Sequence, residues 1–156
     1  MNIKLKLFLY AILISASSLS FAVDTDGDTL PDDWEIENGR DPLVADYMVS
    51  AGFWHTCAID DSGVICWGSN DQGRIDVPEL SNPFQVSAGG SHTCALDDSG
   101  VECWGSNRYG QTNVPTLINP TKISAGELHS CALDDTGVVC WGKNSSGQST
   151  VPELTN

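Results

Sequence analysis

The feature of this sequence that most constrains its fold is a unit that is repeated three times. The clearest copy spans residues 86–105, and related copies span residues 49–68 and 123–142. Each copy contains one histidine, two cysteines and a tryptophan directly after the second cysteine, and these residues recur every 37 positions. A fixed period of this length is typical of chains that stack supersecondary units into a continuous core. We therefore divide residues 47–156 into three repeats, at about 47–83, 84–120 and 121–156.

Each repeat has the pattern of a small antiparallel sheet. In the middle repeat we expect strands near residues 83–88, 92–96 and 101–105. The sequence Asp-Asp-Ser-Gly at residues 97–100 favours a tight turn, so the second and third strands form a hairpin. Residues 112–114 could add a fourth strand, which the following proline restricts to a sheet edge. The predicted fold class is all-β, with antiparallel strands.

The six cysteines are placed to form one disulfide within each repeat. If Leu96 lies opposite Val101 in the hairpin, Cys94 lies opposite Cys103, with both sulfur atoms on the same side of the sheet. The alternative, a zinc site, is not favoured by a spacing of Cys-x8-Cys. Each disulfide would close a loop of about ten residues and contribute roughly 2 to 3 kcal/mol. The predicted pairs are Cys57–Cys66, Cys94–Cys103 and Cys131–Cys140.

Residues 1–22 have the features of a secretory signal peptide. Lys4 and Lys6 form a basic start, residues 7–14 form an apolar run, and small residues precede a cleavage position after Ala22. The apolar run is shorter than the roughly 20 residues that a membrane-spanning helix needs, so we expect no membrane span in the mature chain. We therefore expect an exported protein, in the periplasm or outside the cell, where disulfides form.

The chain is strongly acidic. Its 21 Asp and Glu residues against 7 Lys and Arg give a formal net charge of −14, and loss of Lys4 and Lys6 with the signal peptide makes it −16. Such a surface repels nucleic acid, and the sequence has no basic stripe or aromatic platform that would offset the repulsion. Divalent cations or basic partners are more compatible with this charge.

Residues 23–46 form a separate acidic segment with the spacing of a calcium-binding loop. Carboxylates at alternate positions converge on one centre when the backbone winds into a tight loop, and oxygen ligands suit Ca²⁺. Pro31 favours the start of a short helix over residues 31–38, with acidic side chains in its first turn. The candidate ligands are the side chains of Asp24, Asp26, Asp28, Asp32 and Glu35 and the backbone carbonyl of Leu30.

This acidic segment resembles the EF-hand-like and thrombospondin type 3 calcium loops of secreted bacterial proteins. The resemblance implies calcium as a cofactor. The segment differs from the EF-hand pattern at Thr29, where that pattern has a glycine, and it lacks the incoming helix. The alternative interpretation is a solvated acidic linker.

Three phrases of the repeat carry a resemblance to a known family. They are Ser-Ala-Gly-x-x-His-Thr-Cys-Ala-Leu, Gly-x-x-Cys-Trp-Gly-x-Asn and x-x-Gly-Gln. They resemble the repeats of the regulator of chromosome condensation family, and the 37-residue period is similar to its short-bladed bacterial branch, which includes a secreted beta-lactamase inhibitor. The resemblance implies a β-propeller, normally of seven blades, of which this sequence has three.

Three stacked blades leave two end faces open, and apolar end faces need to be covered. The sequence is compatible with three arrangements. The chain is a piece of a longer propeller, or an open arc of three blades, or a homo-oligomer in which the third blade of one copy meets the first blade of another.

The histidine of each repeat, at His55, His92 and His129, has two interpretations. Three histidines could ligate zinc or copper. Because the position recurs together with its neighbours, we interpret each histidine as a hydrogen-bonding residue that the blade requires, and each tryptophan as packing under the hairpin. No nucleophile with a base, no catalytic carboxylate pair and no phosphate-binding loop stands out, so we expect no enzymatic activity.

Positions that differ between the repeats are candidates for recognition. The two residues before the histidine are Phe53 and Trp54 in the first repeat, and the two after the Trp-Gly-x-Asn phrase are Arg108 and Tyr109 in the second. Aromatic and arginine side chains on the loops of a rigid scaffold often anchor interfaces. We therefore predict that these four residues contact a partner.

Together these features predict an exported, disulfide-stabilised, calcium-associated module that binds a protein or a glycan. An inhibitor of a secreted enzyme would be a narrower version of this function. A hydrolase and a guanine-nucleotide exchange factor are the alternatives. Export argues against exchange, because the GTPases concerned are cytosolic or nuclear.

Overall fold

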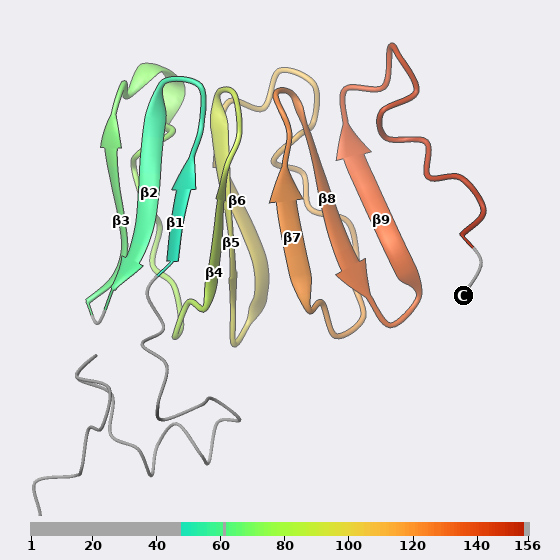
Figure 1. Ribbon diagram of the computed structural model, residues 1–156, viewed down its shortest axis with the longest axis horizontal. Coiled ribbons are helices and arrows are strands. Elements are labelled where there is room, and N and C mark those ends of the chain that lie inside the picture. The colour runs from blue at the N-terminus through green and yellow to red at the C-terminus, as the bar shows by residue number, and fades with distance from the viewer. Residues whose placement is uncertain (1–47, 61, 155–156) are drawn as a thin grey trace, which may run out of the picture. The chain divides into compact units, whose positions relative to one another are not determined.

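The computed structural model describes residues 48–60 and 62–154, which belong to one compact unit, Val44–Asn156. The predicted signal peptide, calcium loop and short helix lie outside the described residues. The described part forms three sheets of three strands each (Figure 1). The strands are β1 (Met48–Ala51), β2 (His55–Asp60), β3 (Gly63–Gly68), β4 (Gln85–Ala88), β5 (His92–Asp97), β6 (Gly100–Gly105), β7 (Lys122–Ala125), β8 (His129–Asp134) and β9 (Gly137–Gly142).

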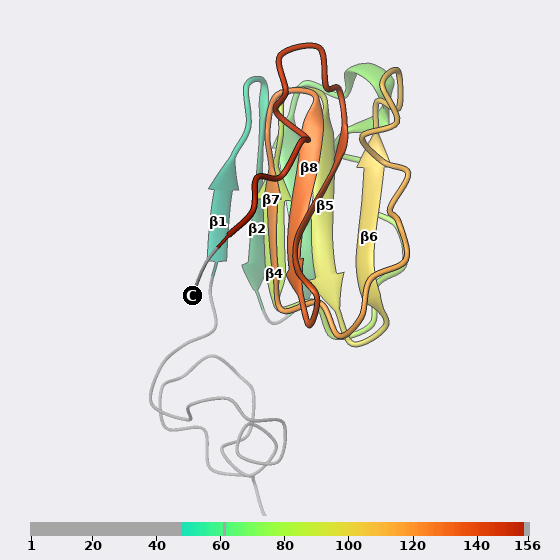
Figure 2. The same cartoon turned by 90° about the vertical axis from the view of Figure 1, so that its right-hand side faces the viewer.

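Each sheet is one blade, and the three blades stack face to face. Blade 1 comprises β1–β3, blade 2 comprises β4–β6 and blade 3 comprises β7–β9, all with antiparallel neighbours. Figure 1 shows the blades in a row, and Figure 2, which looks along that row, shows them one behind another. The all-β fold class and the arrangement of three propeller-type blades are confirmed. Among the described residues, no helix is long and apolar enough to span a bilayer.

The hairpin of each blade is fixed by an aspartate at its turn. In blade 2, Asp97 Oδ1 accepts hydrogen bonds from the backbone nitrogen and the hydroxyl of Ser99, at 2.8 and 2.7 Å. Gly100 then takes a φ of +123°, which a residue with a Cβ rarely adopts. These contacts set the register, in which Leu96 pairs with Val101 and Cys94 with Cys103, as the sequence predicts.

The cross-strand cysteine pairs are joined in all three hairpins. The bonds are Cys57–Cys66, Cys94–Cys103 and Cys131–Cys140, with Cα–Cα distances of 4.1, 4.1 and 4.0 Å. Because the partners face each other directly, each disulfide closes a short loop without any rearrangement of the ladder. The structure therefore pins each hairpin covalently to one register.

The fourth strand that the sequence could add at residues 112–114 does not form. The side chain of Asn107 takes its place as a hydrogen-bond partner, because Asn107 Oδ1 accepts from the backbone nitrogen of Thr112 at 3.2 Å. The backbone nitrogen of Val114 then bonds the carbonyl of Thr112 at 3.0 Å, in a tight turn. These backbone groups are satisfied locally, so a strand pairing would gain little.

The hydrophobic core lies between the blades. A blade is a single layer, so its apolar side chains are buried when the next blade covers them. One cluster joins blades 1 and 2 and contains Cys57, Ile59, Val86 and Ala88. The other joins blades 2 and 3 and contains Cys94, Leu96, Cys103, Ile123, Ala132 and Trp141.

Candidate binding surfaces

In blades 1 and 2, the histidine forms a hydrogen bond to the blade that follows it. His55 Nε2 lies 2.8 Å from the hydroxyl of Thr93, and His92 Nε2 lies 2.9 Å from the hydroxyl of Ser130. A hydroxyl has one proton, and Thr93 donates its proton to the carbonyl of Arg74 at 2.9 Å. His55 must therefore donate through Nε2, which defines its neutral tautomer, and the same argument applies to His92.

The opposite ring nitrogen has no partner in either buried histidine. Nδ1 of His55 and Nδ1 of His92 form no hydrogen bond in the structure. A second proton on this nitrogen would have no acceptor, and burial penalises the charged ring. Burial, together with the neighbouring His55 and His129, lowers the pKa of His92 to about 4. Burial and the charge of Arg74 also lower the pKa of His55.

This geometry supports the structural interpretation of the histidines. The rings of His55 and His92 each donate Nε2–H to a hydroxyl of the next blade. A protonated Nε2 has no lone pair with which to bind a metal. Within residues 48–60 and 62–154, no cluster of three or more histidine, cysteine or carboxylate side chains could hold a metal ion. The predicted calcium ligands, Asp24, Asp26, Asp28, Leu30, Asp32 and Glu35, lie outside the described residues.

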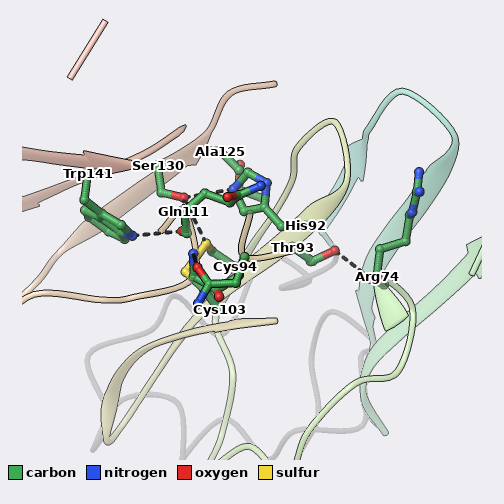
Figure 3. The surroundings of a disulfide bond; sticks show 12 residues. Arg74, His92, Thr93, Cys94, Cys103, Gln111, Ala125, Ser130 and Trp141 are labelled. Carbon is green, nitrogen blue, oxygen red and sulfur yellow. Dashed lines mark hydrogen bonds between the residues drawn. A yellow bond between two sulfur atoms is a disulfide. The ribbon is translucent and has the colours of Figure 1, made fainter. Parts of the chain in front are cut away.

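The tryptophans point the other way along the stack, to the blade that precedes them. Trp104 Nε1 donates to the carbonyl of Arg74 at 3.1 Å, and Trp141 Nε1 donates to the carbonyl of Gln111 at 2.9 Å. Figure 3 shows Trp141, Ser130 and Gln111 meeting beside the Cys94–Cys103 disulfide. The sequence pattern predicts that the tryptophan packs under its own hairpin, and this contact with the preceding blade is not evident from it.

The described residues leave two faces of the stack uncovered, and both faces are partly apolar. On blade 1, Val49 and Trp67 are 71% and 51% exposed, whereas the equivalent Val86 and Trp104 of blade 2 are 2% and 8% exposed. On blade 3, Leu133 is 38% exposed, whereas Leu96 is 1% exposed. We call the outer surface around Val49 and Trp67 the first face, and the outer surface around His129 and Leu133 the third face.

Apart from these two faces, one further surface runs along one edge of all three blades. The start of β2 pairs with the end of β3, so the β1–β2 bend and the segment after β3 lie at the same edge, and the other blades repeat this arrangement. Backbone bonds link the two parts, for example from Ser69 N to Trp54 O at 2.8 Å. We call this surface the loop edge. It carries all four predicted contact residues, Phe53 and Trp54 on blade 1 and Arg108 and Tyr109 on blade 2.

The loop edge carries exposed aromatic side chains and two cations, together with the acidic side chains of Asp71 and Glu127. Phe53 and Trp54 are 63% and 70% exposed. Arg108 Cζ lies 5.5 Å from the centroid of the Tyr109 ring, and Lys143 Nζ of blade 3 lies 5.4 Å from it. Both distances are within the range of cation–π attraction. Lys143 was missed by the sequence analysis, although its repeat equivalents, Ser69 and Ser106, show that it too is a variable position.

The side chains of the repeat's asparagine and glutamine shape the loop that carries Arg108 and Tyr109. Asn107 Nδ2 donates to Asn113 Oδ1 at 2.6 Å, and Gln111 Oε1 accepts from the backbone nitrogen of Tyr109 at 2.9 Å. Gln111 is fully buried between blades 2 and 3. The loop is therefore built on fixed internal contacts, while its exposed tip is free to vary.

Comparisons with known proteins agree with this architecture. The sequence profile of the regulator of chromosome condensation (RCC1) repeat matches residues 49–74, 85–111 and 121–148, more than half of the chain. A comparison with curated proteins finds no significant match.

Several solved structures contain similar blades. The ectodomain of the receptor kinase CR4 from Physcomitrella patens is 27% identical, with a TM-score of 0.53 over 60% of this chain and 28% of that protein. The ectodomain of ACR4 from Arabidopsis thaliana is 27% identical, with a TM-score of 0.51 over 62% and 36%. Prp20p from Saccharomyces cerevisiae is 20% identical, with a TM-score of 0.58 over 68% and 32%.

The chain spans about a third of the length of these structures. Each matched segment falls on one of the three stacked blades. The conserved phrases of the repeat correspond to the contacts between blades described above. This chain therefore belongs to the regulator of chromosome condensation (RCC1) repeat family.

Proposed function

We propose that this protein is an exported, disulfide-stabilised repeat module that binds another protein through its loop edge. One observation carries the proposal: exposed aromatic and cationic side chains gather on the edge where the three repeats differ. Positions that hold the blades together repeat from blade to blade, whereas Phe53, Trp54, Arg108 and Tyr109 do not. Large aromatic residues and arginine are the side chains that most often anchor protein interfaces.

Protein binding is consistent with what similar structures do. Prp20p is described with binding properties toward Gsp1p and histones, and in another structure it is bound by Kap60. At 20% and 17% identity these structures support a shared fold, and the identity of a partner does not transfer. Their contribution is that blades of this kind serve as rigid scaffolds for protein contacts.

Export is supported by the disulfides and by the first 22 residues. Three cross-strand disulfides are stable in an oxidising compartment and are rare in the cytosol. Two similar structures are receptor ectodomains, which also fold outside the cytosol. We expect the mass of the purified mature protein to lack residues 1–22 and six thiol hydrogens. A mature protein that begins at Met1 would contradict export by cleavage after Ala22.

The loop edge suits a partner segment that combines apolar and acidic side chains. Phe53 and Trp54 offer exposed apolar area, and Arg108 and Lys143 offer positive charge on a chain whose formal net charge is −14. Charge complementarity of this kind favours association and selects against wrong partners. A sulfated or carboxylated glycan would share the charge requirement without needing the apolar contacts.

The test uses the oxidised protein as bait in periplasmic extract or culture supernatant. The variant replaces Phe53, Trp54, Arg108 and Tyr109 with alanine, which removes exposed side chains and leaves the blade contacts intact. The matched control replaces Ser145 and Ser146, the equivalents of Arg108 and Tyr109 in blade 3, with alanine. We expect the wild type and the control to retain the same partner protein. The variant with all four alanine substitutions should not retain it.

The purified partner then allows a quantitative measurement. Truncation of interface anchors commonly weakens binding by more than 1 kcal/mol each, so we expect the variant with all four alanine substitutions to bind at least about tenfold more weakly. If the variant binds as tightly as the wild type, the loop edge is not the binding surface. If the partner is an enzyme whose activity falls on binding, the module is an inhibitor.

We also propose that residues 24–35 bind calcium. The proposal is supported by the alternation of Asp24, Asp26 and Asp28 followed by Glu35, which supplies hard oxygen ligands at the spacing of a calcium loop. Calorimetric titration of the mature protein should show calcium uptake that the double variant Asp26→Asn, Asp28→Asn abolishes. Asp41→Asn with Asp46→Asn is the matched control, since it removes equal charge outside that spacing. Uptake that is equal in both variants would indicate an unspecific acidic linker.

A further inference from the structure

The two uncovered faces of the stack carry the two halves of a contact that the chain already makes twice. Between blades 1 and 2, blade 1 supplies His55, the hydroxyl of Ser50 and the carbonyl of Arg74, which bind groups of blade 2. The groups of blade 2 are the hydroxyl of Thr93, the backbone nitrogen of Ala88 and the indole of Trp104. The contact is therefore directional, with different residues on its two sides.

The contact between blades 2 and 3 uses the same set. His92 binds the hydroxyl of Ser130 at 2.9 Å, and the hydroxyl of Ser87 accepts from the backbone nitrogen of Ala125 at 2.8 Å. The carbonyl of Gln111 accepts from Ser130 Oγ and from Trp141 Nε1, each at 2.9 Å. Every one of these bonds is the bond of the first contact moved by one repeat.

The uncovered faces hold the same groups without their partners from a neighbouring blade. The residues 37 positions after His92, Ser87 and Gln111 are His129, Ser124 and Gln148. Their imidazole, hydroxyl and backbone carbonyl lie on the third face. A step of 37 residues back along the chain from blade 2 gives Thr56, the backbone nitrogen of Ala51 and Trp67 on the first face. Each polar group on one face therefore has its complement on the other.

The apolar side chains of the two faces also match. In the contact between blades 2 and 3, Leu96 is buried in one cluster with Ile123 and Trp141. Leu133 of the third face is the equivalent of Leu96, and Val49 and Trp67 of the first face are the equivalents of Ile123 and Trp141. These three side chains are exposed in the single chain, and a contact between the two faces would bury them together.

We propose that the third face of one copy binds the first face of a second copy of this chain, head to tail. The residues that pair are His129 with Thr56, Ser124 with Ala51, the carbonyl of Gln148 with Thr56 and Trp67, and Leu133 with Val49 and Trp67. The two faces differ, so the interface is heterologous, and it continues the stack of blades from one copy into the next. This inference is independent of the loop edge and of its partner.

The hydrogen bonds of the Gln85 amide have no equivalent in the proposed contact, and their loss is tolerated. The side-chain amide of Gln85 bonds both the carbonyl and the nitrogen of Ile123, at 3.1 and 2.9 Å, between blades 2 and 3. The third face has Lys122 at this position. Blade 1 has Met48 there and still stacks on blade 2 through the cluster of Cys57, Ile59 and Val86. The amide is therefore not required for two blades to stack.

The test places a charge on one face at a time. Val49→Arg blocks the first face and Leu133→Arg blocks the third, and both side chains are exposed in the single chain, so the fold of each variant is maintained. The control Ile65→Arg adds the same charge at a position whose equivalent in the covered blade 2, Glu102, is exposed. Sedimentation velocity is measured for each oxidised protein over a range of concentrations.

We expect the wild type and Ile65→Arg to assemble as concentration rises, and each blocked variant to associate at least about tenfold more weakly, because a buried unpaired charge is unfavourable. A mixture of Val49→Arg and Leu133→Arg should form dimers and nothing larger, since it offers one usable first face and one usable third face. Trp67→Ala and His129→Ala are milder variants of the same two faces and should weaken assembly in the same way.

The proposal is overturned if the wild type remains a monomer at all concentrations, as it would if another part of the chain covered either face. It is also overturned if the blocked variants assemble like the wild type, or if their mixture stays monomeric. Because Val49→Arg leaves the loop edge unchanged, binding of a partner by this variant reports on the proposed function separately.

Discussion

In blades 1 and 2, the histidine of the repeat acts as a neutral hydrogen-bond donor to the following blade. Its Nε2–H is committed to a hydroxyl, and its Nδ1 faces no acceptor in the two covered contacts. Protonation of the ring would place a buried charge between two blades. The residue that the sequence offered as a metal ligand is therefore a point at which acid weakens the stack.

We expect the free energy of unfolding to fall by about 3 kcal/mol as the pH drops from 6.5 to about 4, on account of His92. In the unfolded chain the pKa of this histidine is near 6.5, so the unfolded state binds a proton below that pH. Folded His92 binds the proton only below about pH 4. The stability is thus complete above pH 6.5 and is lost through this window. Urea unfolding at pH 7.5 and 4.5 measures the difference.

The variant His92→Gln is the control for this pH dependence, because it cannot titrate. It should be less stable at pH 7.5 and should lose less stability on acidification than the wild type. Hydrogen bonds from Ser62 lower the pKa of the Asp60 carboxyl below its usual 3.8, so this group titrates outside the window. An equal loss in wild type and variant would show that His92 is not responsible.

A second residue-level prediction concerns the glycine before the histidine. A Cβ on Gly89 would lie 2.5 Å from the carbonyl oxygen of Gly126 in the next blade and 2.6 Å from the His92 ring. Gly89→Ala should therefore destabilise the protein by about 1 to 3 kcal/mol in thermal or urea unfolding. At Gly126 the closest atoms all belong to the ring of His129, which no following blade covers.

Gly126→Ala is therefore the matched control. It should lower the free energy of unfolding by less than Gly89→Ala does, because the ring of His129 is able to move aside. Equal costs for the two variants would mean that the backbone of the neighbouring blade is not what excludes a side chain at Gly89.

At the scale of the strand, the hairpin is the element that the sequence predicted best. Its register follows from the turn aspartate and from the cysteine spacing, both of which act over a few residues. The second and third strands are each one residue longer than expected, since β5 extends to Asp97 and β6 begins at Gly100. The three-strand blade followed for the same reason: local turn chemistry determines where each strand stops.

Contacts between elements were less accessible from the sequence. The direction of Trp104 and the bond from His92 to Ser130 depend on which blade faces which, and a repeat shows only that these residues recur. The absent fourth strand had a local cause, because the amide of Asn107 satisfies the backbone of Thr112. The sequence predicts Phe53, Trp54, Arg108 and Tyr109 as candidate contact residues, because these positions differ between the repeats. Only the folded structure shows that these four residues lie on one edge together with Lys143.

The disulfide that closes each hairpin should contribute to the free energy of unfolding. Replacing Cys94 and Cys103 with alanine opens a loop of about ten residues and should lower the free energy of unfolding by about 3 kcal/mol on the chain-entropy model. The pair Cys131 and Cys140 closes the same loop, but its cysteines are half-buried. The equivalent variant in blade 3 should lose less stability, because fewer packing contacts go with the bond. Equal losses in urea unfolding would assign the whole effect to loop entropy.

For the described stack as a whole, stability should depend on how many neighbours a blade has. Every residue of β5 is buried, whereas buried and half-buried residues alternate along β2. Stacked repeats stabilise one another mainly through nearest-neighbour contacts. Blade 2 is covered on both sides, so it should open last.

Hydrogen–deuterium exchange followed by mass spectrometry tests this expectation. Amides of β5 should exchange most slowly, and those of β1 and β9 faster, because these strands lie at sheet edges or on uncovered blades. Variants that weaken one contact, such as Gly89→Ala, should speed exchange in blades 2 and 3. Uniform protection across the three blades would show that the stack unfolds as one unit with no preference for its centre.

The hydrogen bonds made by His55, His92, Ser50 and Ser87 to the following blade join residues that are 38 positions apart, and they recur at both contacts. A duplicate of residues 84–120 inserted after the original would therefore bring its own imidazole, hydroxyl, indole and carbonyl to both new contacts. No further mutation would be required for the added blade to stack. Gain of a repeat would therefore change the protein by one complete blade and leave the contacts between blades unchanged, so the number of blades is free to change while the interface that joins them stays the same.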